Sequence, residues 1–202
     1  MDMDTPSTIL RSLQIIKGSE HLYAIKRIEP PHPGHFLLVK TANQEHEIIT
    51  ELITQWVLRG TFYLIAGGEW LPDHDDLRYS VYRYTTNIEE TLNNLTLARP
   101  FTCFQLLDLL MEAGRHNKPI LILDFLHLFH DEDVELSLRH RVLDQCCQYT
   151  KRLSLSSLVA VLVPTLSTET YQRFFPVLAA VADEILETRK HEETELIQSL
   201  LF

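Results

Sequence analysis

The chain has 202 residues, of which 45% are hydrophobic and 23% charged, a balance typical of one globular domain of ordinary size. Its net charge of -10, with no visible cluster of Lys or Arg, disfavours autonomous nucleic-acid binding and leaves nucleic acid as an indirect partner only. No apolar run reaches the roughly 20 residues that span a bilayer, and the acidic start MDMDTPSTIL lacks the positive charge of a secretory signal. We therefore expect a cytoplasmic protein without a membrane partner.

Short apolar runs alternate with segments of helical periodicity in the first half of the chain. In chain order, the patterns predict a helical lead-in over 1–20, an edge strand over 21–28, a central strand over 35–40, a helix over 45–58, a strand over 61–66, a short strand over 80–84 and a helix over 88–95 capped by Asn87.

The second half continues the same alternation. It predicts a helix capped by Thr102, a very hydrophobic strand over 119–123, a long helix over 134–153, a strand over 158–163, a helix over 169–182, a last strand over 184–189 and a C-terminal helix over 190–202. Such alternation is typical of an α/β domain with a mostly parallel sheet and helices on both faces. Residues 1–202 are expected to form this single domain.

Three strings point to a known family: FYLIAGGEWLP at 62–72, LARPFTCFQLLDLL at 97–110 and KPILILD at 118–124. In this order they resemble the second strand, the following Ala-Arg-x-Phe segment and the Walker B strand of RecA/RadA recombinases. The resemblance implies a three-layer RecA-like P-loop NTPase core, with Asp124 at the Walker B position.

The phosphate-binding loop of that family is missing. Such a loop needs glycines, a lysine and a Ser or Thr hydroxyl, so that backbone N–H groups and side chains surround the phosphates and magnesium. The segment in its place contains none of the Gly-Lys-Ser/Thr pattern and consists of Thr41, Ala42, Asn43, Gln44, Glu45, His46 and Glu47. The two glutamates at the start of a helix would supply the negative charge that a phosphate brings. We therefore expect no nucleotide cofactor.

Other family features are also replaced. The resemblance places Gly67 at the catalytic glutamate, although Glu69 lies two residues later in the same loop, and Pro164-Thr165 at the polar sensor. The first DNA-binding loop corresponds to the acidic segment 125–133, and only a tight turn fits the second. We interpret Asp124 as a structural carboxylate bonded to nearby backbone N–H groups, rather than as a magnesium ligand.

We therefore expect a non-catalytic RecA/RadA-like paralogue that serves as a scaffold or regulatory subunit, linked by the resemblance to DNA recombination or repair. Its partner would be another protein, either a second copy or a RecA-like ATPase. The alternatives are an enzyme with an atypical active site around Asp124 and Glu69, or a residual ATPase. A single-strand binder that uses Trp70 and Phe101 is disfavoured by the negative charge.

Several smaller features have a structural interpretation. The groups Asp73–Asp76 and His127, His130, Asp131 and Asp133 lack a recognised metal-ligand spacing, so no metal site is expected. Arg141 and Arg152 are eleven residues apart on a helix and share a face that could contact a phosphate or an acidic partner. The cysteines are expected to be buried thiols, and the apolar stripe Leu196, Ile197, Leu200, Leu201 and Phe202 is expected to pack on the domain itself or on a partner.

Overall fold

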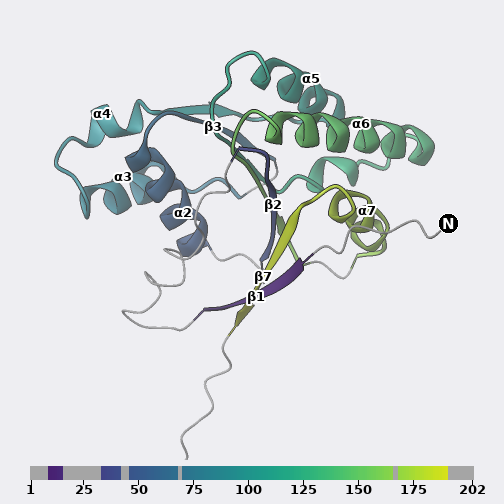
Figure 1. Cartoon of the computed structure of the whole chain (residues 1–202), viewed down its shortest axis with the longest axis horizontal. Coiled ribbons are helices and arrows are strands. Elements are labelled where there is room, and N and C mark those ends of the chain that lie inside the picture. Colours follow the sequence, from purple (N-terminus) through teal and green to yellow (C-terminus); the bar gives the residue numbers. More distant parts are fainter. Residues whose placement is uncertain (1–8, 16–32, 42–45, 68–69, 166–167, 191–202) are drawn as a thin grey trace, which may run out of the picture.

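The computed structural model describes residues 9–15, 33–41, 46–67, 70–165 and 168–190. This part of the chain forms an α/β unit around one sheet (Figure 1). The strands are β1 (Ile9–Ile15), β2 (Phe36–Thr41), β3 (Phe62–Ala66), β4 (Leu95–Ala98), β5 (Ile120–Leu123), β6 (Val159–Pro164) and β7 (Glu184–Lys190). The helices are α2 (His46–Arg59), α3 (His74–Tyr82), α4 (Ile88–Leu92), α5 (Cys103–Ala113), α6 (Leu136–Ser154) and α7 (Glu169–Ala179), with a 3-10 turn η1 (His127–Phe129).

The seven strands of the described part are parallel and lie in the order β1-β7-β2-β6-β5-β3-β4. Two strands, β6 and β5, therefore lie between β2 and β3, although β3 follows β2 along the chain. This order differs from the common dinucleotide-binding order 3-2-1-4-5-6 and from the flavodoxin-like order 2-1-3-4-5. Because the strands are parallel, all their carboxyl ends meet at one edge of the sheet.

Helices cover both faces of the sheet, as the sequence predicts. Figure 1 shows α2, α3 and α4 on one side and α5, α6 and α7 on the other. Alternation along β2 explains the two layers: Phe36 and Leu38 face the α5–α6–α7 layer, while Leu37 and Val39 face the α2–α3 layer. Almost every residue of β2, β5 and β6 is buried, which gives these strands continuous apolar runs instead of alternating ones.

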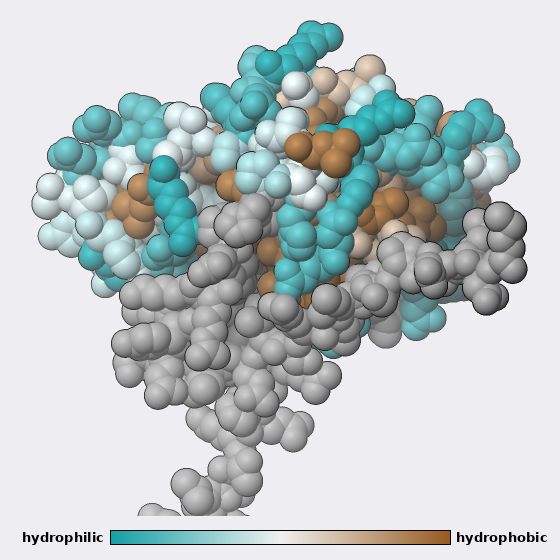
Figure 2. All heavy atoms as spheres, in the orientation of Figure 1, coloured by the Kyte–Doolittle hydropathy of each residue, from teal (hydrophilic) through white to brown (hydrophobic). Residues whose placement is uncertain are grey.

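The surface of the described part is mainly hydrophilic on the face in Figure 2. Hydrophobic residues on this face lie in separate groups. None of the helices in the described ranges is long and apolar enough to cross a membrane.

The predictions for β2, β3, β5, β6 and β7 and for α2, α5, α6 and α7 are confirmed to within a few residues. Thr102 caps α5 as expected, since its side chain accepts a hydrogen bond from the Gln105 N–H at 3.2 Å. The expected edge strand at 21–28 lies outside the described residues. So does the C-terminal helix, apart from Lys190, which belongs to β7.

Three predictions are wrong. The helical lead-in is a strand over Ile9–Ile15, because this segment pairs along the whole of β7. The expected strand at 80–84 mostly belongs to α3, in which Leu77, Ser80 and Val81 are buried at helical spacing. The helix predicted over 88–95 ends at Leu92, since Leu95–Ala98 form β4 by pairing with β3.

Candidate functional site

Asp124 directly follows β5, at the edge of the sheet where the carboxyl ends meet. Its backbone N–H donates to the Leu162 carbonyl of β6 at 2.9 Å, and its φ is +52°, in the left-handed region. A residue with a Cβ pays about 1 kcal/mol or more for that conformation, although Asp tolerates it better than most. A strained, non-glycine residue at this edge marks the place as a candidate site.

The carboxyl group of Asp124 is buried, with 5% of the residue exposed. Its Oδ2 lies 3.7 Å from His127 Nδ1. Within the described ranges, no backbone N–H donates to the carboxylate, and residues 68 and 69 of the adjoining loop lie outside those ranges. Burial raises the pKa of Asp124 to about 6, and the nearby His127 opposes part of that rise.

Gly67 lies against the backbone of Asp124, at the position where the family resemblance implies a catalytic glutamate. Its N–H donates to the Leu123 carbonyl at 2.9 Å. A Cβ placed on Gly67 would lie 2.9 Å from the Asp124 carbonyl oxygen, closer than real Cβ atoms approach. With the present backbone, a glutamate side chain therefore does not fit at position 67.

The segment that the family resemblance places at the phosphate loop is described only at its ends. The hydroxyl of Thr41 is buried and donates to the Val163 carbonyl at 3.4 Å, while the Thr41 carbonyl accepts from the Thr165 N–H at 2.8 Å. Residues 42–45, including Ala42, Asn43, Gln44 and Glu45, lie outside the described residues. Glu47 is exposed in the first turn of α2, where a negative charge stabilises the helix N-terminus.

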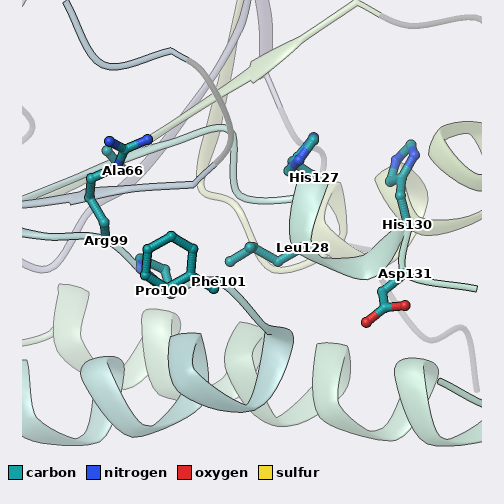
Figure 3. A pocket seen from close by; sticks show the side chains of 8 residues that line it. All are labelled: Ala66, Arg99, Pro100, Phe101, His127, Leu128, His130 and Asp131. Carbon is teal, nitrogen blue, oxygen red and sulfur yellow. The ribbon is translucent and has the colours of Figure 1, made fainter. Parts of the chain in front are cut away.

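An open cavity of about 480 Å³ lies at the same edge, beyond β3, β4 and β5. Figure 3 shows its lining: Arg99, Pro100 and Phe101 come from the connection between β4 and α5, and the opposite side is formed by residues at and after η1, namely His127, Leu128, His130 and Asp131. The volume falls within the range of small-ligand sites, roughly 300 to 1,000 Å³.

Two of the polar residues that line this cavity are histidines. The rings of His127 and His130 stack with their centres 6.4 Å apart. The pKa of His130 is lowered, first by burial and then by the charges of His127 and Arg139, so its ring is favoured in the neutral form. Nε2 of His130 is buried without a hydrogen-bond partner in the described part of the chain. The cavity thus offers two imidazole groups beside the exposed ring of Phe101, together with the charged side chains of Arg99 and Asp131.

The structure brings together only part of the predicted sites. Asp124 contacts the cavity through His127, but Glu69 lies outside the described residues. Asp73 and the start of α3 do not line the cavity. Within the described ranges, no three His, Cys, Asp or Glu side chains are grouped closely enough to hold a metal ion.

The remaining predicted residues lie on α6 and in the core. Arg141 and Arg152 are both exposed on α6, and the Arg152 guanidinium lies 5.5 Å from the centre of the Tyr149 ring. The prediction that the cysteines are buried and free is confirmed. Burial also raises the pKa of the Cys146 and Cys147 thiols, which makes them poor nucleophiles.

Sequence reasoning missed two groups of residues. Arg99 belongs to the string LARPF, which indicated a family resemblance and not a cavity, and Phe101 of the same string was considered only as a possible nucleic-acid contact. Glu51 is buried on α2 and accepts hydrogen bonds from Arg83 Nη2 at 2.6 Å and Tyr84 Oη at 2.5 Å. A charged residue between the apolar positions of a helix was the available signal, because it needs a partner when buried.

The sequence matches no protein-family model, and no curated protein matches it.

Proposed function

We propose that this protein is a non-catalytic RecA/RadA-like paralogue, which acts as a scaffold or regulatory subunit in a protein complex linked to DNA recombination or repair. The observation that carries the proposal is the tight packing of Gly67 against the Asp124 carbonyl. A Cβ added at Gly67 would lie only 2.9 Å from that carbonyl oxygen. The backbone fills the space that a catalytic glutamate would need beside the Walker B position.

The arrangement of the sheet supports a RecA-like origin. The strands that would carry the phosphate loop and the Walker B aspartate are β2 and β5, with only β6 between them. Neighbouring strands lie about 4.8 Å apart, so the ends of β2 and β5 are about 10 Å apart, a distance that a triphosphate with its magnesium can bridge. The strand framework suits a nucleotide, whereas the segment at 41–47 has no glycine and no lysine.

The side chains at this edge also support a non-catalytic role. The Thr41 hydroxyl already donates a hydrogen bond to the Val163 carbonyl. The Asp124 carboxyl group is buried beside His127, and burial raises its pKa to about 6, so the charged form that binds magnesium is less favourable here than for an exposed aspartate.

Isothermal titration calorimetry with ATP and Mg²⁺ tests the proposal, with Asp124→Ala as the comparison. We expect no heat of binding from either protein at micromolar concentrations. Micromolar binding by the natural chain that Asp124→Ala abolishes would overturn the proposal and would favour a residual ATPase.

The second candidate, an enzyme with an atypical active site, is favoured by one observation. Asp124 combines a left-handed backbone with a buried carboxyl group, and His127 connects it to the cavity. Strain and a raised pKa together are frequent at active sites. A screen of hydrolysable esters and phosphoesters with the natural chain and His127→Asn tests it; turnover that needs His127 would support this candidate, and its absence would remove it.

A further inference from the structure

The outward face of α3 carries two large exposed tyrosines. Tyr79 is 70% and Tyr82 62% exposed, and they are three residues apart, so they are neighbours on the helix surface. The opposite face of α3 is buried, because Leu77, Ser80 and Val81 pack against the domain. We call the exposed surface formed by Asp75, Asp76, Tyr79 and Tyr82 the tyrosine face.

The fold itself does not account for these tyrosines. Within the described ranges, neither ring stacks on another ring or a cation, and neither hydroxyl makes a hydrogen bond. By contrast, the neighbouring Tyr84 donates to Glu51 at 2.5 Å and lies beneath the Arg83 guanidinium. Tyrosine is enriched at protein interfaces and among the residues that contribute most to their binding energy.

The charges around the pair indicate what it contacts. Asp75 and Asp76 lie on the same side of α3, one turn before Tyr79. The two arginines of this region are already paired: Arg78 forms an ion pair with Glu89 of α4, and Arg83 forms one with the buried Glu51. Asp75 lies 3.6 Å from the exposed His74 ring. The tyrosine face therefore combines aromatic rings with two carboxylates that pair with no Lys or Arg of the described part.

Asp75 and Asp76 alone would need no partner, because carboxylates in the first turn stabilise a helix. The helix dipole does not explain the tyrosines that follow them. Rings next to carboxylates make a surface for guanidinium groups, which stack on aromatic faces while they bond to acidic oxygens. In Figure 2 the lobe over α3 and α4 is covered mainly by hydrophilic and near-neutral residues, consistent with a polar docking surface rather than a hydrophobic one.

We propose that the tyrosine face of α3 binds an arginine-rich segment of a partner protein. Guanidinium groups of the segment stack on Tyr79 and Tyr82, and Asp75 and Asp76 accept their hydrogen bonds. This inference rests on the proposed scaffold role and gives the partner its chemistry. A nucleic acid is disfavoured as the occupant, because its phosphates would meet the two aspartates.

The test uses the full chain and three fluorescein-labelled synthetic peptides of equal length: alternating Arg-Ser, alternating Lys-Ser and alternating Glu-Ser. Fluorescence anisotropy measures binding at 50 and 150 mM salt. We expect the Arg-Ser peptide to bind, the Lys-Ser peptide to bind more weakly and the Glu-Ser peptide not to bind.

Four double variants separate the aromatic and charged contributions. Tyr79→Leu with Tyr82→Leu keeps apolar area but removes the rings, and we expect roughly tenfold weaker binding of the Arg-Ser peptide. Tyr79→Phe with Tyr82→Phe keeps the rings and should bind within about twofold of the natural chain. Asp75→Asn with Asp76→Asn should weaken binding roughly tenfold, whereas Glu132→Gln with Asp133→Asn, an equal charge change on an exposed loop, should change it by less than about twofold.

Several results would overturn the inference: no binding of the Arg-Ser peptide, equal loss in both acidic pairs, or no loss in the leucine pair. Sedimentation velocity tests whether a second copy of the chain occupies the face instead. Self-association that the leucine pair abolishes would mean that it does. None of these results bears on ATP binding, so the calorimetric test of the scaffold role is decided separately.

Discussion

Replacing Asp124 with Asn should make the protein more stable at neutral and alkaline pH. The carboxyl group is buried, and its pKa is raised from 3.8 to about 6, so ionisation is less favourable in the folded protein than in the unfolded chain. A group with a raised folded pKa binds more protons when folded, and stability therefore falls as the pH rises from about 4 to about 6. Asn has nearly the same shape, does not ionise and tolerates the left-handed backbone at this position.

The size of the effect follows from the pKa. At 1.36 kcal/mol for each pH unit, a rise from 3.8 to about 6 corresponds to about 3 kcal/mol at pH 8 and to about 1 kcal/mol at pH 4.5. Loss of the ion pair with His127 offsets little of this gain in stability, because the two atoms are 3.7 Å apart and the His127 side chain is 55% exposed. We therefore expect Asp124→Asn to gain 2 to 3 kcal/mol at pH 8 and about a third of that at pH 4.5.

Urea unfolding followed by circular dichroism at both pH values measures the two gains. Asp183→Asn is the matched control, since Asp183 accepts the Phe36 N–H at 2.7 Å and pairs with Lys151. Burial acts to raise the pKa of Asp183, but the hydrogen bonds from Lys151 and Phe36 outweigh it and lower the pKa. This control should lose stability at pH 8 and lose less in acid. A gain for Asp124→Asn that is the same at both pH values, or no gain at pH 8, would refute the reasoning.

Three further predictions concern other buried positions. Gly67→Ala should cost about 1 to 3 kcal/mol in the free energy of urea unfolding, because its Cβ meets the Asp124 carbonyl, and an unchanged value would mean that this backbone moves easily. Glu51→Ala should cost about 2 to 3 kcal/mol in the same assay, since it leaves Tyr84 and Arg83 without their acceptor, while Glu51→Gln should cost less. The thiols of Cys103, Cys146 and Cys147 should react with Ellman's reagent at pH 8 only after denaturant is added, and a fast-reacting thiol in the native protein would contradict their burial.

The central strands could be predicted from the sequence because burial on both faces leaves a local signal. ILIL of β5 and VAVLV of β6 are apolar throughout, and each ends at a polar residue or a proline. β4 gave no such signal: LTLA is half exposed at the edge of the sheet, and its pairing with β3 determines its conformation. β1 was missed for the same reason, since its pairing with β7 joins residues 175 positions apart.

The candidate site was only partly predictable. Asp124 was found because it ends an apolar strand. The cavity was not found, because it joins residues 99–101 to residues 127–131, which are close only once β4 and β5 lie on either side of β3. The Gly67 contact was equally invisible, because it depends on the distance between two backbones and not on any motif. The sequence pointed to Gly67 only as a substitution relative to the resembling family.

The packing of Gly67 also bears on whether the inferred loss of catalysis can be reversed. If this chain descends from an active ATPase, a single codon change at position 67 would not restore the acidic residue, since any side chain there collides with the neighbouring main chain. Recovery would also require the backbone to shift, and the Asp124 carbonyl that the new Cβ meets already accepts a hydrogen bond from the His127 N–H of η1 at 3.1 Å. Restoring the side chain would thus need a compensating backbone change, so sterics as well as selection would hold such a lineage in its non-catalytic state.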